Sequence, residues 1–105
     1  EEVIRFIETN YASKISVSDI ARSIGLNRSY LNSLFKEQMN TSIQSYLIRF
    51  RIERACELMA NRQLTIGDIA RSVGYDDPLL FSKVFRKLKG MSPREYRRLT
   101  EEAGL

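Results

Sequence analysis

Apolar residues recur along this chain at the spacing of an α-helix, and no stretch alternates in the manner of a β-strand. Within residues 1–12, for example, Val3, Ile4 and Ile7 fall on one face of a helix. The pattern and its end signals predict further helices over about residues 16–24, 27–38, 41–60, 65–74, 77–89 and from 92 onward. We therefore expect an all-α fold of about seven helices.

Residues that favour the start or the end of a helix define these boundaries. Three segments have the spacing of a capping box, in which two residues satisfy each other's free amides: Ser16 with Asp19, Thr65 with Asp68, and Ser92 with Glu95. Another helix is expected to begin at Asp77-Pro78, which offers an acceptor at the cap and a proline in the first turn. The helix ends are expected at Gly25, Gly74, Gly90 and, as a left-handed cap of the helix over 41–60, at Asn61.

The five residues DIARS occur twice, from Asp19 and from Asp68, at an offset of 49 residues. Beyond the glycine that follows, the offset becomes 50, so the second copy has one extra residue in its turn. Each copy predicts a short helix, a glycine turn and a longer helix, which is the pattern of a helix-turn-helix. A plain helical hairpin or the start of a helical array is the alternative. The presence of only two copies, with a basic second copy, favours the helix-turn-helix.

The long central helix is expected to join two subdomains, because two fully separate cores of this size would each be marginal. We expect a first helix-turn-helix subdomain over residues 1–41, a linker helix over 42–61 and a second subdomain over 62–105. Two helices that contact one face of DNA lie about 34 Å apart. A helix of about 20 residues spans about 30 Å, so this linker suits two consecutive segments of the major groove.

The composition removes most enzyme chemistry. The chain has no histidine and a single cysteine, Cys56, so the commonest general base is absent, as are the ligands of a multi-cysteine zinc site. We predict no catalytic residues, no metal and no cofactor, and a protein that is not an enzyme. The lone cysteine, expected to be packed or half-packed, fits a reducing, cytoplasmic location. No apolar run approaches the length of a membrane span.

Positive charge is concentrated near the end of the chain. The net charge is +4, and residues 83–98 hold seven basic side chains against one acidic side chain, Glu95. Such a run is either a solvated face or a surface for a polyanion. Together with the helix-turn-helix pattern it favours double-stranded DNA as the partner. A module that binds an acidic protein is the alternative.

The segment IGDIARSVGYDDPLLFSKVFRKLKGMSPREYRR strongly resembles the second helix-turn-helix of AraC/XylS-type transcription regulators. The positions that carry the resemblance are Ala70, Gly74, Tyr75, Phe81, Phe85, Arg86, Lys87, Gly90, Pro93, Tyr96 and Arg97. The first copy and the linker segment YLIRFRIERACELM fit as well, so the resemblance covers essentially the whole chain. It implies a seven-helix domain that inserts two recognition helices into adjacent major grooves.

The resemblance also implies partners and a role. Many members carry a separate effector or receiver domain, which is missing from this chain, and RNA polymerase is an expected partner. Activation is expected rather than repression, and the first copy, ISVSDIARSIGLNRSYLNSLFK, is similar to that of regulators of sugar use. Related DNA-repair proteins that accept methyl groups use similar domains, so a methyl-accepting Cys56 is an alternative.

In the first candidate recognition helix, Leu31, Leu34 and Phe35 are expected to form the inward stripe. The outward face then holds the expected base-contacting residues Arg28, Ser29, Asn32 and Ser33. The family motif places base contacts at the last three of these. Asparagine pairs with N6 and N7 of adenine, whereas serine serves several bases. Lys36 on the same face is expected to bind phosphate.

In the second candidate recognition helix, the expected inward stripe is Leu80, Phe81, Val84, Phe85 and Leu88. The expected base-contacting residues are Leu79, Ser82 and Lys83. Lys83 donates to guanine O6 and N7, at a position where the family motif makes a base contact, and Leu79 packs against a thymine methyl group. The expected phosphate ligands are Arg86, Lys87, Arg94 and Arg97. Plain solvation of these polar faces is the alternative.

Overall fold

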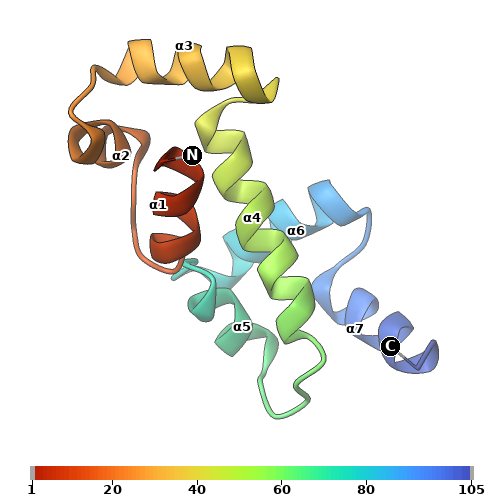
Figure 1. The fold of residues 1–105 in the computed structure, drawn as a ribbon. Coiled ribbons are helices and arrows are strands. Elements are labelled where there is room, and N and C mark those ends of the chain that lie inside the picture. Colours follow the sequence, from red (N-terminus) through yellow and green to blue (C-terminus); the bar gives the residue numbers. More distant parts are fainter. Residues whose placement is uncertain (1, 105) are drawn as a thin grey trace. The chain divides into compact units, whose positions relative to one another are not determined.

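The structure, a computed structural model, describes residues 2–104 and places seven α-helices and no strand in that range (Figure 1). The helices are α1 (Glu2–Asn10), α2 (Val17–Ile24), α3 (Arg28–Met39), α4 (Ile43–Leu58), α5 (Ile66–Ser72), α6 (Pro78–Lys89) and α7 (Pro93–Glu102). The predicted all-α fold is confirmed.

All three predicted capping boxes are formed. At the start of α2, the Ser16 Oγ accepts a hydrogen bond from the Asp19 N–H over 3.1 Å, and the Asp19 carboxylate accepts one from the Ser16 N–H over 2.9 Å. The same pair of bonds opens α5 and α7, at Thr65 with Asp68 and at Ser92 with Glu95. In each box the N–H of the capping residue lowers the pKa of the acid, because it stabilises the charged carboxylate.

The DIARS repeat builds the same turn twice. Gly25 and Gly74 have φ angles of 84° and 99°, in the left-handed region that favours glycine. In both copies the N–H of the residue after the glycine bonds the alanine carbonyl of DIARS, over 3.0 Å and 2.9 Å. The extra residue of the second turn, Asp76, lies between this bond and the helix cap Asp77.

The described chain forms two compact units, one ending at Phe50 and the other beginning at Arg51, so that α4 contributes to both. In the first unit, α1, α2, α3 and the first half of α4 enclose the buried residues Val3, Ile7, Val17, Ile20, Ala21, Leu31, Phe35, Ile43 and Leu47. The Tyr46 ring packs edge-on against Phe35, with ring centroids 5.6 Å apart. Apolar burial and this aromatic contact fix α3 on the unit.

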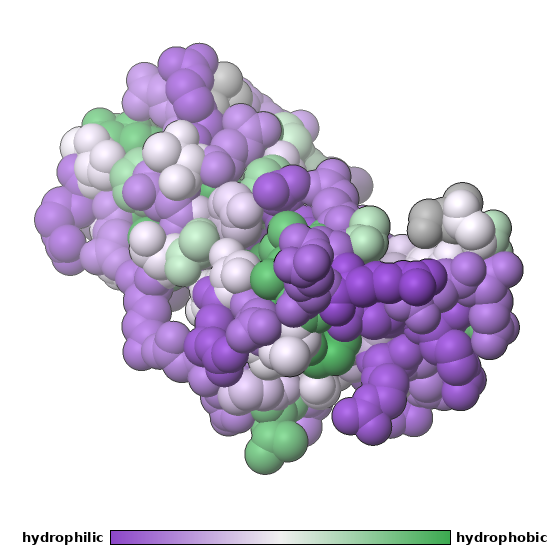
Figure 2. All heavy atoms as spheres, turned by 90° about the horizontal axis from the view of Figure 1, so that it is seen from below, coloured by the Kyte–Doolittle hydropathy of each residue, from purple (hydrophilic) through white to green (hydrophobic). Residues whose placement is uncertain are grey.

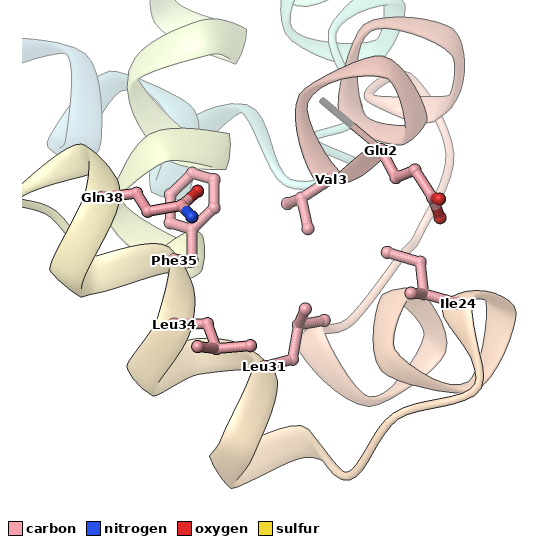
Figure 3. Close-up of a pocket in the computed structure, with 7 residues that line it drawn as sticks. All are labelled: Glu2, Val3, Ile24, Leu31, Leu34, Phe35 and Gln38. Carbon is pink, nitrogen blue, oxygen red and sulfur yellow. The ribbon is translucent and has the colours of Figure 1, made fainter.

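A small apolar pocket opens at the edge of this first core. It has a volume of about 160 Å³. The side chains of Val3, Ile24, Leu31 and Leu34 point toward one another across it, from α1, α2 and α3 (Figure 3). Leu34, expected in the inward stripe, is 36% exposed here. It therefore lies at the rim of the core and not within it.

The second unit repeats this packing with the second half of α4 in the place of α1. Its buried apolar residues are Ile52, Ala55, Met59, Ile69, Ala70, Val73, Tyr75, Phe81 and Phe85. Tyr96 packs edge-on against Phe85 over 5.5 Å, as Tyr46 does against Phe35 at positions 50 residues earlier. Arg51 is buried as well, with its guanidinium 5.5 Å from the centre of the Tyr75 ring.

One predicted cap is wrong. α4 ends at Leu58, and Asn40 is the only residue other than glycine with a positive φ between residues 2 and 104. Asn61 is therefore not a left-handed cap. Its side-chain oxygen instead accepts a hydrogen bond from the Gln63 N–H over 3.1 Å, which makes a local turn of the kind that asparagine favours.

Candidate nucleic-acid interface

The second helix of each copy turns one face to the core and one to solvent. On α3, Leu31 and Phe35 are buried, whereas the predicted residues Arg28, Ser29, Ser33 and Lys36 are exposed. On α6, Phe81 and Phe85 are buried, whereas Leu79, Lys83, Arg86 and Lys87 are exposed. Asn32 and Ser82, which occupy matching positions of the two helices, are half-buried.

Side chains also hold the first turn of each of these helices. The Asn27 side chain accepts hydrogen bonds from the N–H groups of Ser29 and Tyr30, over 2.9 Å and 3.3 Å. The Asp77 carboxylate accepts one from the Leu79 N–H over 3.0 Å, and Pro78 occupies the first helical position. The exposed residues Ser29 and Leu79 therefore stand on a backbone that is fixed before any partner binds.

Asn32 has a contact that the sequence did not predict. Its side-chain oxygen accepts a hydrogen bond from the Ile43 N–H over 3.2 Å. Ile43 is the first residue of α4, where a backbone N–H has no partner within the helix. The predicted contact with adenine requires the same oxygen to accept from N6. The structure therefore ties Asn32 to the start of α4.

The second copy has no counterpart of the hydrogen bond between Asn32 and the Ile43 N–H, and its sequence shows why. The residues that match Asn32 and Ile43 at an offset of 50 are Ser82 and Pro93. Proline has no N–H, so the start of α7 needs no acceptor at this point. Ser82 instead lines a pocket of about 290 Å³ together with Ser92, Pro93 and Arg94. Two predicted DNA contacts, Ser82 and Arg94, thus border one opening although they lie on different helices.

Arg97 also serves the fold. Its guanidinium donates to the backbone carbonyl of Leu64 over 2.8 Å and to that of Asn61 over 3.3 Å, both in the segment between α4 and α5. These bonds use two of the five N–H donors of the guanidinium and tie α7 to the segment before α5. Arg97 therefore holds α7 on this segment, and its contact with phosphate stays a prediction.

Two cations of the basic run have acidic partners. The Lys89 ammonium lies 2.7 Å from the Glu53 carboxylate, and this hydrogen bond raises the pKa of Lys89. Arg98 lies 4.0 Å from Glu102. The side chains of Lys83, Arg86, Lys87 and Arg94 are exposed on α6 and at the start of α7. These four make the basic surface of the second unit.

More leucine side chains of α6 are exposed to solvent than the sequence predicts. Leu79 is 81% exposed, as expected for a residue of the outward face. Leu80 and Leu88, expected in the inward stripe, are 49% and 40% exposed, so this expectation is wrong for both. The phenylalanines of α6 fill the core at neighbouring positions and leave the two leucines at its edge. Elsewhere hydrophilic residues dominate the visible surface, and hydrophobic ones form scattered patches (Figure 2).

Cys56 is half-buried on α4. Burial raises the pKa of its thiol, and a hydrogen bond with Tyr96 offsets this only in part. A reactive cysteine has a lowered pKa, so these surroundings oppose a methyl-accepting role.

The described part of the chain holds no group of three or more metal-ligating His, Cys, Asp or Glu residues. Between residues 2 and 104, no helix has the length and apolar character required to cross a bilayer.

Known proteins resemble the chain along most of its length. A family model described as a helix-turn-helix domain matches residues 20–99. The chain is 43% identical over 97 residues to the lactose operon transcription activator of Staphylococcus xylosus, covering 92% of this chain and 35% of that protein. It is 35% identical over 102 residues to the arabinose operon regulatory protein of Escherichia coli, covering 96% and 35%. The chain thus spans about a third of the length of these relatives.

Solved structures show the same fold. The C-terminal domain of AraT, a response regulator from Geobacillus stearothermophilus, has a TM-score of 0.90 at 31% identity, covering 92% of this chain and 81% of that one. The DNA-binding domain of AdpA, solved in complex with a target DNA, has a TM-score of 0.91 at 20% identity, covering 97% and 92%. At that identity the second likeness concerns the fold alone.

Proposed function

Because the chain belongs to the AraC-type family of helix-turn-helix DNA-binding domains, we propose that it binds duplex DNA sequence-specifically through α3 and α6. The observation that carries the proposal is the duplication itself. Both copies have the same glycine turn, the same buried aromatic contact and a second helix whose polar face is exposed. Such a helix has the dimensions to enter the major groove.

We divide the interface into residues that contact bases and residues that bind phosphate. Base contacts come from Arg28, Ser29 and Ser33 on α3 and from Leu79, Ser82 and Lys83 on α6. Phosphate contacts come from Lys36, Arg86, Lys87 and Arg94, which fix the orientation of the protein without selecting a sequence. Asn32 acts indirectly, because it positions the start of α4.

The two helices are proposed to enter consecutive segments of the major groove, about 34 Å apart along one face of the duplex. α4 has no glycine or proline and contributes residues to both units. A single chain then binds an asymmetric site, because α3 and α6 expose different residues at matching positions.

The whole protein is proposed to regulate transcription in the bacterial cytoplasm, as an activator of genes for sugar use. The names of the relatives support this, since they include a lactose operon transcription activator and a raffinose operon regulatory protein. RNA polymerase would be its partner. We propose that such a protein also contains an effector or receiver domain. The lengths of the relatives leave room for one, since this chain spans only 35% of each. We propose no catalytic role.

The test compares Lys83→Ala with Lys87→Ala in binding to a site selected from random duplex DNA and to that site with single base changes. Lys83→Ala should cost about 1–3 kcal/mol on the selected site and relax the preference at one base pair. Lys87→Ala should weaken all sequences alike and reduce the slope of log affinity against log salt by about 0.9. Arg62→Ala, which changes an exposed arginine paired with Glu101, is the matched control. Recovery of no preferred sequence by the unaltered protein would exclude the proposed function.

A further inference from the structure

The first turn of α6 exposes two adjacent leucines. Leu79 is 81% exposed and Leu80 is 49% exposed, whereas the core of the unit is filled by Phe81 and Phe85. One exposed leucine needs no explanation. Two at the start of a basic helix, on a backbone fixed by the Asp77 cap, make a preformed apolar contact surface.

These leucines share a face with the cationic side chain of α6. Leu79 precedes Lys83 by four residues and Leu80 precedes it by three, and both spacings make neighbours on a helix surface. Arg86 and Lys87 continue the exposed basic surface along the same helix. The apolar pair therefore belongs to the surface proposed to face DNA, and the surrounding charges complement a polyanion.

The matching positions of α3 carry different chemistry. The residues that match Leu79 and Leu80 at an offset of 50 are Ser29 and Tyr30. Both are exposed, and Tyr30 is 57% exposed. The two copies therefore place a hydroxyl pair on α3 and an aliphatic pair on α6 at the same point of the same scaffold. This difference predicts that the two halves of the DNA site are recognised in different ways.

We propose that Leu79, with Leu80 beside it, binds the C5-methyl group of a pyrimidine in the DNA segment contacted by α6. This inference rests on the proposed function. Among the base edges exposed in the major groove, the methyl group of thymine is the apolar feature, and aliphatic side chains contact it. A methylated cytosine bears its methyl group on the same ring carbon. The recognised chemistry is the methyl group, and thymine or 5-methylcytosine is its source.

The experiment uses a duplex site selected from a random pool. Each thymine of the half assigned to α6 is replaced in turn by deoxyuridine, which removes only the methyl group. At one or two positions we expect the affinity of the unaltered protein to fall about fourfold, equivalent to about 0.8 kcal/mol for one buried methyl group. Leu79→Ala should bind the thymine and deoxyuridine sites equally. Leu99→Ala, which truncates a 45% exposed leucine on α7, should keep the full difference.

A second arm distinguishes the two sources of the methyl group. At a position sensitive to deoxyuridine, the T·A pair is replaced by C·G, with and without a 5-methyl group on the cytosine. If the methyl group alone is recognised, methylation should restore about fourfold in affinity for the unaltered protein and nothing for Leu79→Ala. If methylation restores nothing while deoxyuridine still weakens binding, thymine is the only source.

Two results would overturn the inference and leave DNA binding intact. One is a selected site at which no deoxyuridine substitution in the α6 half lowers affinity, including a site with no thymine there. The other is a methyl effect that persists in both Leu79→Ala and Leu80→Ala, which would assign it to other residues. Absence of any sequence preference would be different, because it would contradict the proposed function itself. Both leucines are largely or half exposed, so circular dichroism should show that the variants fold.

Discussion

At the scale of single residues, matching positions of the two copies serve different purposes. Asn32 and Ser82 lie 50 residues apart at one position of the helix-turn-helix, but only Asn32 stands opposite a backbone N–H, that of Ile43. Pro93 removes the corresponding donor in the second copy. Asn32, which the sequence predicts to contact a base, thus also makes a contact within the fold. Matching positions of a repeat do not imply matching roles.

This assignment of Asn32 predicts a change in stability and not in base preference. Asn32→Ala leaves the buried Ile43 N–H without its acceptor and should lower the free energy of unfolding by about 1 kcal/mol. Urea unfolding measures this, and Ser82→Ala is the matched control, expected to change it by less than about 0.5 kcal/mol. Asn32→Ala should select the same bases as the unaltered protein. Loss of preference at one base pair with unchanged stability would show that Asn32 contacts DNA directly.

At the scale of the helices, local signals determine the ends and the turns. Gly25 has a φ of 84° and a Cβ placed on it would meet no atom within 4 Å, so a substitution there is costly through the backbone alone. Gly67 is different. It lies inside α5 with no left-handed φ, and a Cβ there would meet the end of the Arg71 side chain at 3.4 Å and the Thr65 Oγ1 at 3.7 Å.

The two glycines therefore predict effects of opposite sign. Gly25→Ala forces alanine into the left-handed region and should lower the free energy of unfolding by about 1 kcal/mol. Gly67→Ala should raise it by about 0.5 kcal/mol, because alanine loses less conformational entropy in a helix. Urea unfolding of both variants measures these changes in the free energy of unfolding. Equal effects would mean that the turn does not need the left-handed conformation.

The capping boxes predict acid sensitivity. The pKa values of Asp19, Asp68 and Glu95 are lowered in the folded protein by the hydrogen bonds that these carboxylates accept from backbone N–H groups. A lowered folded pKa gives stability that is present above the ordinary values of 3.8 for the aspartates and 4.5 for Glu95, and is lost as pH falls through the folded values.

The melting temperature should accordingly fall as the solution is acidified below about pH 4. A variant with Asp19→Asn, Asp68→Asn and Glu95→Gln should show a shallower fall over the same range. An identical pH profile for the two proteins would show that the boxes do not contribute. Glu8→Gln, which changes an exposed acid of α1 outside the boxes, serves as the control.

The helix starts could be predicted because their signals are local. Ser16 and Asp19, or Asp77 and Pro78, lie within one turn of each other, so the sequence alone specifies the bonds that they make. Contacts between distant segments could not be predicted in this way. Arg97 reaches carbonyls 33 and 36 residues away, and Asn32 bonds an amide 11 residues away. Periodicity places Leu80 on the inner side of α6, but only packing decides that Phe81 and Phe85 fill the core instead.

At the scale of the whole molecule, one scaffold occurs twice with unequal charge. The unit beginning at Arg51 holds eleven basic and eight acidic side chains, whereas the unit ending at Phe50 holds six and five. The exposed cations Lys83, Arg86 and Lys87 all belong to α6. Because phosphate contacts dominate affinity and its salt dependence, the second unit should provide most of both. The first unit should contribute mainly selectivity.

Both helix-turn-helix copies are proposed to contact bases within one site. Selection from a random duplex pool, followed by sequencing of the bound fraction, measures both contacts in one experiment. We expect two blocks of preferred bases with centres about 10–10.5 base pairs apart. Lys83→Ala should alter one block, and a Ser29→Ala, Ser33→Ala double variant should alter only the other. A single block, or two variants that alter the same block, would contradict the claim.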